Sequence, residues 1–140
     1  MKFETIMRPS EILRQYLLPL FPQEEDFEKS EYPIYIDYQF SFKDIGDKRI
    51  TILQNSSSSP SRFVGNQEYI SGNTCDIVVS AQNADEAYTV SQVIKNKLNN
   101  SRGLYGVIDI KPMSDVEPLG INAKKYYMFS CAYAIIKEDK

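Results

Sequence analysis

Hydrophobic side chains occupy every second position after Pro33, and this alternation most constrains the fold of the chain. The alternating positions are Ile34, Ile36, Tyr38, Phe40 and Phe42. Successive side chains of a strand point to opposite faces, so the pattern predicts a strand with one buried face. A turn over residues 44–47 and a second strand over 49–54 follow, and we expect the two strands to form an antiparallel hairpin.

Two segments have helical periodicity instead. The first runs from Pro9 to about Phe21, where hydrophobic side chains recur at helical spacing and Pro19 is expected to end or kink the helix; the hydrophobic positions are Ile12, Leu13, Tyr16, Leu17 and Leu20. The second begins at Asn83, a residue that caps helices well, with Glu86 three positions later. Its buried stripe is predicted to contain Ala87, Val90, Ile94 and Leu98.

Three more strands are predicted, over residues 73–81, 104–111 and 126–137, and residues 113–125 are predicted to be a loop because they contain Pro118 and Gly120. The order is therefore α-β-β-β-α-β-β. This order predicts an α+β fold with an antiparallel or mixed sheet of about four to five strands and both helices on one face. The length of 140 residues suits a single domain, residues 1–140.

Residues 55–72 are expected to form a long flexible loop or arm. A serine run over 56–59 is followed by a proline and then by Arg62, Phe63 and Tyr69. Loops of this length within a domain are often functional or disordered. Two interpretations stay open: a loop without a role, or an arm that becomes ordered on a partner through these three residues.

The composition argues against catalysis. The chain has no histidine and two cysteines, Cys75 and Cys131, so the usual catalytic triads and zinc sites are not expected. No phosphate-binding glycine motif is present, and we predict no cofactor and no metal. The net charge of −3 argues against specific nucleic-acid binding, and no hydrophobic run is long enough to span a membrane. Nearby carboxylates, at Asp109, Asp115 and Glu117, are interpreted as solvated charges.

Aromatic residues are abundant, with ten tyrosines and seven phenylalanines. Most are expected in the core. Tyr35, Tyr127 and Tyr133 are candidates for the sheet face away from the helices, where exposed tyrosines would suit a protein interface.

The stretch Asn73–Leu98, in which a strand leads into a helix through the sequence Asn-Ala-Asp-Glu-Ala at 83–87, resembles the tail-terminator and tail-completion proteins of bacteriophages with long non-contractile tails. These are often described as minor capsid or minor structural proteins. The resemblance implies a hexameric ring at the head-proximal end of the tail tube. It also implies contacts with the tail-tube protein and the head connector, and a location in the virion after synthesis in the host cytoplasm. A head-closure protein of similar size is an equally open interpretation.

Two other functions remain open at this point. One is a small intracellular adaptor that binds a protein or ligand along a sheet edge or in a pocket. The other is an enzyme that uses two carboxylates in a cleft.

Overall fold

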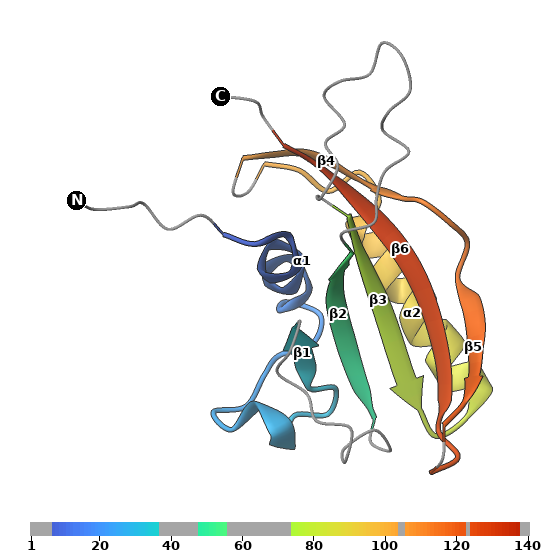
Figure 1. The fold of residues 1–140 in the computed structure, drawn as a ribbon. Coiled ribbons are helices and arrows are strands. Elements are labelled where there is room, and N and C mark those ends of the chain that lie inside the picture. The colour runs from blue at the N-terminus through green and yellow to red at the C-terminus, as the bar shows by residue number, and fades with distance from the viewer. Residues whose placement is uncertain (1–6, 37–47, 56–73, 104–105, 123, 138–140) are drawn as a thin grey trace.

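The computed structural model describes residues 7–36, 48–55, 74–103, 106–122 and 124–137. Over these residues the chain forms two α-helices, a short 3₁₀ helix and a six-stranded mixed sheet (Figure 1). The predicted α+β class is therefore confirmed, with one more strand than expected. The elements are α1 (Pro9–Leu17), η1 (Phe27–Lys29), β1 (Ile34–Ile36), β2 (Arg49–Asn55), β3 (Thr74–Ala81), α2 (Ala84–Leu98), β4 (Val107–Pro112), β5 (Glu117–Ile121) and β6 (Tyr127–Lys137).

The sheet is built around a long antiparallel pair, β3 and β6. The strands follow the order β1-β2-β3-β6-β4, and β5 also pairs with β6. β4 pairs with residues 133–137 of β6 and β5 with residues 127–130, so β4 and β5 follow one another along the same outer side of β6. In Figure 1, β5 lies at the right-hand margin of the sheet.

The first two strands pair in parallel, with Ile34 opposite Ile50 and Ile36 opposite Ile52. The predicted antiparallel hairpin is therefore wrong. Twelve residues, 37–48, separate β1 from β2, and a connection of about a dozen residues is long enough to return the chain to the same end of the sheet. Most of this connection lies outside the described residues, and so do residues 37–42 of the predicted 34–42 strand.

The segment 113–125 was predicted to be a loop, and this is wrong for residues 117–121, which form β5. The strand tolerates Pro118 and Gly120 because it lies at an edge and contains a bulge between these two residues, where Gly120 has a φ of +114°. A turn then leads into β6. The Asn122 side-chain oxygen accepts hydrogen bonds from the backbone N–H groups of Lys124 at 2.9 Å and Tyr126 at 3.0 Å.

Both helices begin as the sequence predicts. α1 begins at Pro9 but ends at Leu17, earlier than expected, because Pro19 stops the helix rather than kinking it. In α2, the Asn83 side chain accepts a hydrogen bond from the Glu86 backbone N–H at 2.7 Å, which confirms the predicted cap. Within the described part of the chain, no helix is long and apolar enough to cross a membrane.

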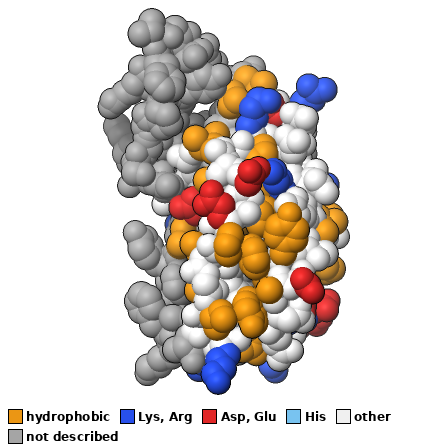
Figure 2. Space-filling view, turned by 90° about the vertical axis from the view of Figure 1, so that its right-hand side faces the viewer, with side chains coloured by type: hydrophobic (Ala, Val, Ile, Leu, Met, Phe, Trp, Pro, Cys, Tyr) orange, Lys and Arg blue, Asp and Glu red, His pale blue; other side chains and the backbone are white. Residues whose placement is uncertain are grey.

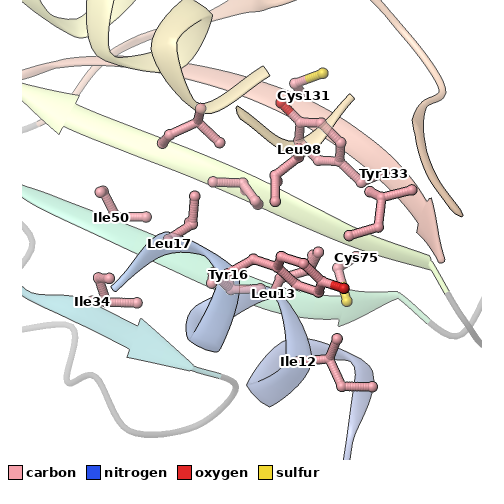
Figure 3. Packing of buried hydrophobic residues seen from close by; sticks show 14 of the residues in the cluster. Ile12, Leu13, Tyr16, Leu17, Ile34, Ile50, Cys75, Leu98, Cys131 and Tyr133 are labelled. Carbon is pink, nitrogen blue, oxygen red and sulfur yellow. The ribbon is translucent and has the colours of Figure 1, made fainter. Parts of the chain in front are cut away.

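The core lies between the helices and one face of the sheet (Figure 3). α1 packs on β1 and β2, while α2 packs on β3, β6 and β4, and the helices also contact each other. The predicted arrangement of both helices on one face is therefore confirmed. Fully buried side chains come from both helices and from the sheet, and they include Ile12, Leu13, Leu17, Ile50, Ile52, Cys75, Leu98 and Tyr133.

Candidate functional site: an exposed hydrophobic sheet edge

Three of the six residues predicted to bind a partner are described by the structure, namely Tyr35, Tyr127 and Tyr133. Arg62, Phe63 and Tyr69 lie outside the described residues, as does the serine-rich segment around them. Tyr133 is fully buried and pairs with Cys75 on the helix-bearing face, so its expected place on the opposite face is wrong.

The other two tyrosines have different surroundings. Tyr127 pairs with the buried Ala81 and therefore shares the helix-bearing face, where it is half-buried. Tyr35 pairs with Thr51 and does point away from the helices, but it is 4% exposed. The Phe27 ring lies 5.1 Å from the Tyr35 ring and the Arg49 guanidinium 4.6 Å from it, so Tyr35 is part of a packed cluster.

The conspicuous exposed surface is instead the outer edge made by β4, β5 and the link between them. Large hydrophobic side chains here are about half exposed: Ile108 51%, Met113 46%, Leu119 54% and Ile121 55%. All five residues of β5 are exposed. Figure 2 shows hydrophobic side chains gathered on the side of the molecule that carries β5. A hydrophobic strand at a sheet edge is a ready template for pairing with another chain.

Two contacts connect β5 to the rest of this surface. Pro118 pairs with Phe129 of β6, and the Phe129 ring lies 5.6 Å from the Tyr88 ring of α2, with an edge-to-face geometry. Tyr88 is itself 45% exposed. We call Tyr88, Pro118, Leu119, Ile121 and Phe129 the β5 edge patch.

Charges of opposite sign lie at the two ends of this patch. Asp115 and Glu117 are at the beginning of β5, and Lys124 and Lys125 are in the turn that follows it; all four residues are exposed. The Asp115 carboxylate is 3.5 Å from the Lys95 ammonium of α2, and its side chain is 95% exposed. The strand is therefore acidic at its start and basic at its end.

Two of the carboxylates considered for catalysis, Asp109 and Glu117, lie far apart. Asp109 pairs with Ile136 and Glu117 with Ser130, six residues apart on β6, which corresponds to roughly 20 Å along the strand. Asp109 is also 3.1 Å from the Lys111 ammonium. These two carboxylates therefore cannot act as a pair. The described residues contain no group of three or more histidine, cysteine or acidic side chains that could hold a metal ion.

A second polar cluster joins the beginning of α2 to the segment before β1. The Tyr32 hydroxyl donates a hydrogen bond to Glu86, whose carboxylate is 3.1 Å from the Lys48 ammonium. The same ammonium lies 4.8 Å from the centre of the Tyr32 ring. Burial, and then the bond to Glu86, raise the pKa of Tyr32, while the bonds from Tyr32 and Lys48 lower the pKa of Glu86. Each group holds another in place, which indicates a structural role.

An adaptor that binds a ligand would need a pocket. The described surface has an open hollow of about 500 Å³ lined by Glu24, Glu25, Asp26 and Lys29. The four residues belong to one short stretch of chain, and none of these described lining residues is hydrophobic. It is therefore a less convincing binding surface than the β5 edge patch.

The sequence contains a signal for this edge that the prediction did not use. Leu119 and Ile121 flank a glycine in the segment predicted to be a loop, and two large aliphatic residues so close together are unusual in an exposed loop. No protein-family model matches this chain, and no curated protein matches its sequence.

Proposed function

We propose that this protein is a non-catalytic structural subunit of a bacteriophage tail, a ring-forming terminator or completion subunit at the head-proximal end of the tail tube. Its partners are then further copies of itself, the tail-tube protein and the head connector. No cofactor takes part, and the protein is located in the virion after synthesis in the host cytoplasm. Support for the specific role comes from the resemblance of residues 73–98 to such proteins.

The observation that carries a contact-making function is the exposure of the β5 edge patch. Leu119 and Ile121 are more than half exposed, and the Tyr88 ring, 45% exposed, contacts Phe129 on the strand beside β5. Exposed hydrophobic groups that adjoin an uncovered strand are typical of protein interfaces, because water contact there is unfavourable until a partner covers them.

The test combines imaging with a tube-binding assay. The purified protein is viewed by negative-stain electron microscopy, alone and with tail tubes of the phage whose genome encodes it. We expect rings with a central hole, protein at one end of each tube, and arrest of tube growth. If tail tubes grow at an unchanged rate and carry none of this protein at their ends, the terminator role is ruled out.

A matched pair of variants tests whether the β5 edge patch makes these contacts. Leu119→Asp places a charge in the patch and is expected to abolish rings or tube binding. Val93→Asp places the same charge on α2 at a residue that is 41% exposed and outside the patch, and it is expected to change neither. If the two substitutions have equal effects on rings and tube binding, the β5 edge patch is not part of the interface.

The adaptor function is kept as a second candidate because the same edge suits strand addition by an extended peptide. It predicts a protein that stays monomeric with tail tubes present and that binds a foreign extended segment along β5. The imaging experiment therefore separates the two functions.

A further inference from the structure

We infer that β5 is a strap that detaches from β6 while the rest of the sheet stays folded, and that Ser114 is the latch that fastens it. We call residues 117–121 the β5 strap. The inference goes beyond the proposed function and does not depend on it. Detachment uncovers the outer side of β6 over residues 127–130, so the strap determines which strand edge the protein presents to a partner.

The β5 strap contributes little to the hydrophobic core. All five of its residues are exposed, whereas β4, on the same outer side of β6, buries Val107 and Ile110. Leu119 and Ile121 are already 54% and 55% exposed, so their detachment brings little further hydrophobic surface into contact with water. A bulge also interrupts the pairing of β5 with β6. A segment with so few buried contacts opens at a lower cost in free energy than the whole protein unfolds.

Ser114 fastens the chain to β6 just before the strap begins. Its side-chain oxygen accepts a hydrogen bond from the Ala132 N–H at 3.4 Å, and its carbonyl accepts one from the Cys131 thiol at 3.3 Å. The neighbouring Met113 N–H donates to the Ala132 carbonyl at 2.7 Å. These bonds fall between the part of β6 that pairs with β4 and the part that pairs with β5. The Ser114 side chain therefore takes the place of a backbone acceptor in the ladder.

Other contacts hold the two ends of the strap unequally. Val116 is 9% exposed and belongs to the core cluster, so it supports the latch. The ion pair of Asp115 with Lys95 adds little, because the Asp115 side chain is 95% exposed. At the far end, the turn held by Asn122 joins the strap directly to β6. We therefore expect the strap to open from its Ser114 end and to hinge at this turn.

The geometry of β6 identifies the amides that report on detachment. Ala132 directs both its N–H and its carbonyl to the link between β4 and β5, so it faces the outer side of β6. Successive residues of a strand bond to opposite neighbours. Met128 and Ser130 therefore have the strap-facing amides, whereas Phe129 and Cys131 have the β3-facing amides. Adjacent residues of one strand thus report on two different edges.

Hydrogen exchange measured residue by residue with NMR tests the inference on the full chain. We expect the strap-facing amides to exchange on the order of 100-fold faster than the β3-facing amides, because detachment costs less than unfolding of the sheet. Low concentrations of urea should hardly change the fast rates, since detachment exposes little surface. Equal exchange rates for the two sets would overturn the inference, because β5 would then open only with the whole sheet.

A disulfide tests whether the fast exchange requires detachment. Glu117 lies opposite Ser130, and opposite residues have Cβ atoms about 4.5–5.5 Å apart, which a disulfide spans with a small backbone adjustment. The native Cys75 and Cys131 are buried. Oxidation of the variant Glu117→Cys with Ser130→Cys should slow exchange at Met128 to about the rate of the β3-facing amides. The reduced variant is the control, and equal rates at Met128 in the oxidised and reduced proteins would contradict the inference.

The latch is tested by Ser114→Ala, which removes the oxygen that accepts the bond from Ala132. The strap-facing amides should exchange about threefold faster or more, as expected for the loss of one hydrogen bond, while the β3-facing amides keep their rates. The matched control Ser101→Ala removes a hydroxyl that bonds to the Lys97 carbonyl after α2, and it should change neither set. If Ser114→Ala leaves the strap-facing rates unchanged, or accelerates both sets equally, Ser114 is not the latch.

Discussion

The hydrogen bond between Tyr32 and Glu86 leads to a quantitative prediction about stability. The bond joins the segment before β1 to the first turn of α2, 54 residues later in the chain. Tyr32→Phe removes the hydroxyl and keeps the ring, which is 6% exposed, so the packing against Phe21 is retained. Glu86 keeps its contact with Lys48 at 3.1 Å. The substitution therefore isolates one hydrogen bond.

The size of the effect follows from the charge and exposure of the acceptor. Hydrogen bonds to charged groups contribute about 1.5–3 kcal/mol to stability. The Glu86 side chain is 32% exposed, so water weakens the bond and places it at the low end of that range. We expect Tyr32→Phe to cost about 1.5 kcal/mol, a shift of about 1 M in the urea midpoint if the slope is about 1.5 kcal/mol per molar.

The assay is urea unfolding of Tyr32→Phe, Glu86→Ala and the double variant, followed by circular dichroism. The double-mutant cycle should give a coupling of about 1 kcal/mol or more. The folded-state pKa of Glu86 is lowered from its ordinary 4.5, so the stability due to its charged form is present above that value and is lost as the pH falls. The coupling should accordingly decrease at acid pH.

Tyr88→Phe is the matched control, since the Tyr88 hydroxyl is exposed and accepts a hydrogen bond from Gln92 at 2.9 Å. It should change the free energy of unfolding by less than about 0.5 kcal/mol. Additive single substitutions, or a coupling that is the same at pH 7 and at acid pH, would show that Tyr32 and Glu86 do not stabilise the fold through this bond.

Three further predictions concern the helix cap, the core and alkaline pH. Asn83→Ala should cost about 1 kcal/mol in thermal unfolding because Asn83 caps α2, whereas the exposed neighbour Gln82, changed to Ala, should have almost no effect. Leu98→Ala should cost about 2–5 kcal/mol because the side chain is fully buried, and a cost under about 1 kcal/mol would mean that the site collapses or is loosely packed. Burial, and then the neighbouring Cys131 thiol, raise the pKa of Tyr133; its buried hydroxyl makes no hydrogen bond to the described residues. Tyr133→Phe should therefore leave the free energy of unfolding unchanged or raise it by up to about 1 kcal/mol. The variant should also lose less stability than the wild-type protein as the pH rises above 10. A clear loss of stability at neutral pH would contradict this prediction.

Local signals in the sequence predicted α2 and the long strands well. The Asn83 cap depends on residues only three positions apart, and the buried stripe of α2 depends on one periodic pattern. The direction of β1 could not be predicted in the same way, because alternation shows that a segment is a strand without showing which strand it meets. β5 has little strand propensity of its own, and its pairing with β6 forms it.

The candidate site could be predicted from the sequence only in part. Tyrosines are common both in cores and at interfaces, so counting them could not separate the buried Tyr133 from the exposed Tyr88. The β5 edge patch depends on the register between β5 and β6. This register places Phe129 of β6 opposite Pro118, and the Phe129 ring in turn contacts Tyr88 of α2. That register is a tertiary property. The short sequence from Glu117 to Ile121 does not contain it.

The position of β6 in the sheet has a consequence for biosynthesis. β6 is the last described strand in the chain, yet it is the central one that β3, β4 and β5 all require as a partner. On the ribosome, these three strands leave the exit tunnel before the strand that joins them. β3 can already pair with β2, but β4 and β5 have no described partner strand until β6 is synthesised, which is a period of vulnerability to aggregation or to chaperone capture. A stall in translation between residues 121 and 127 would therefore leave β4 and β5 without the strand that joins them to the sheet.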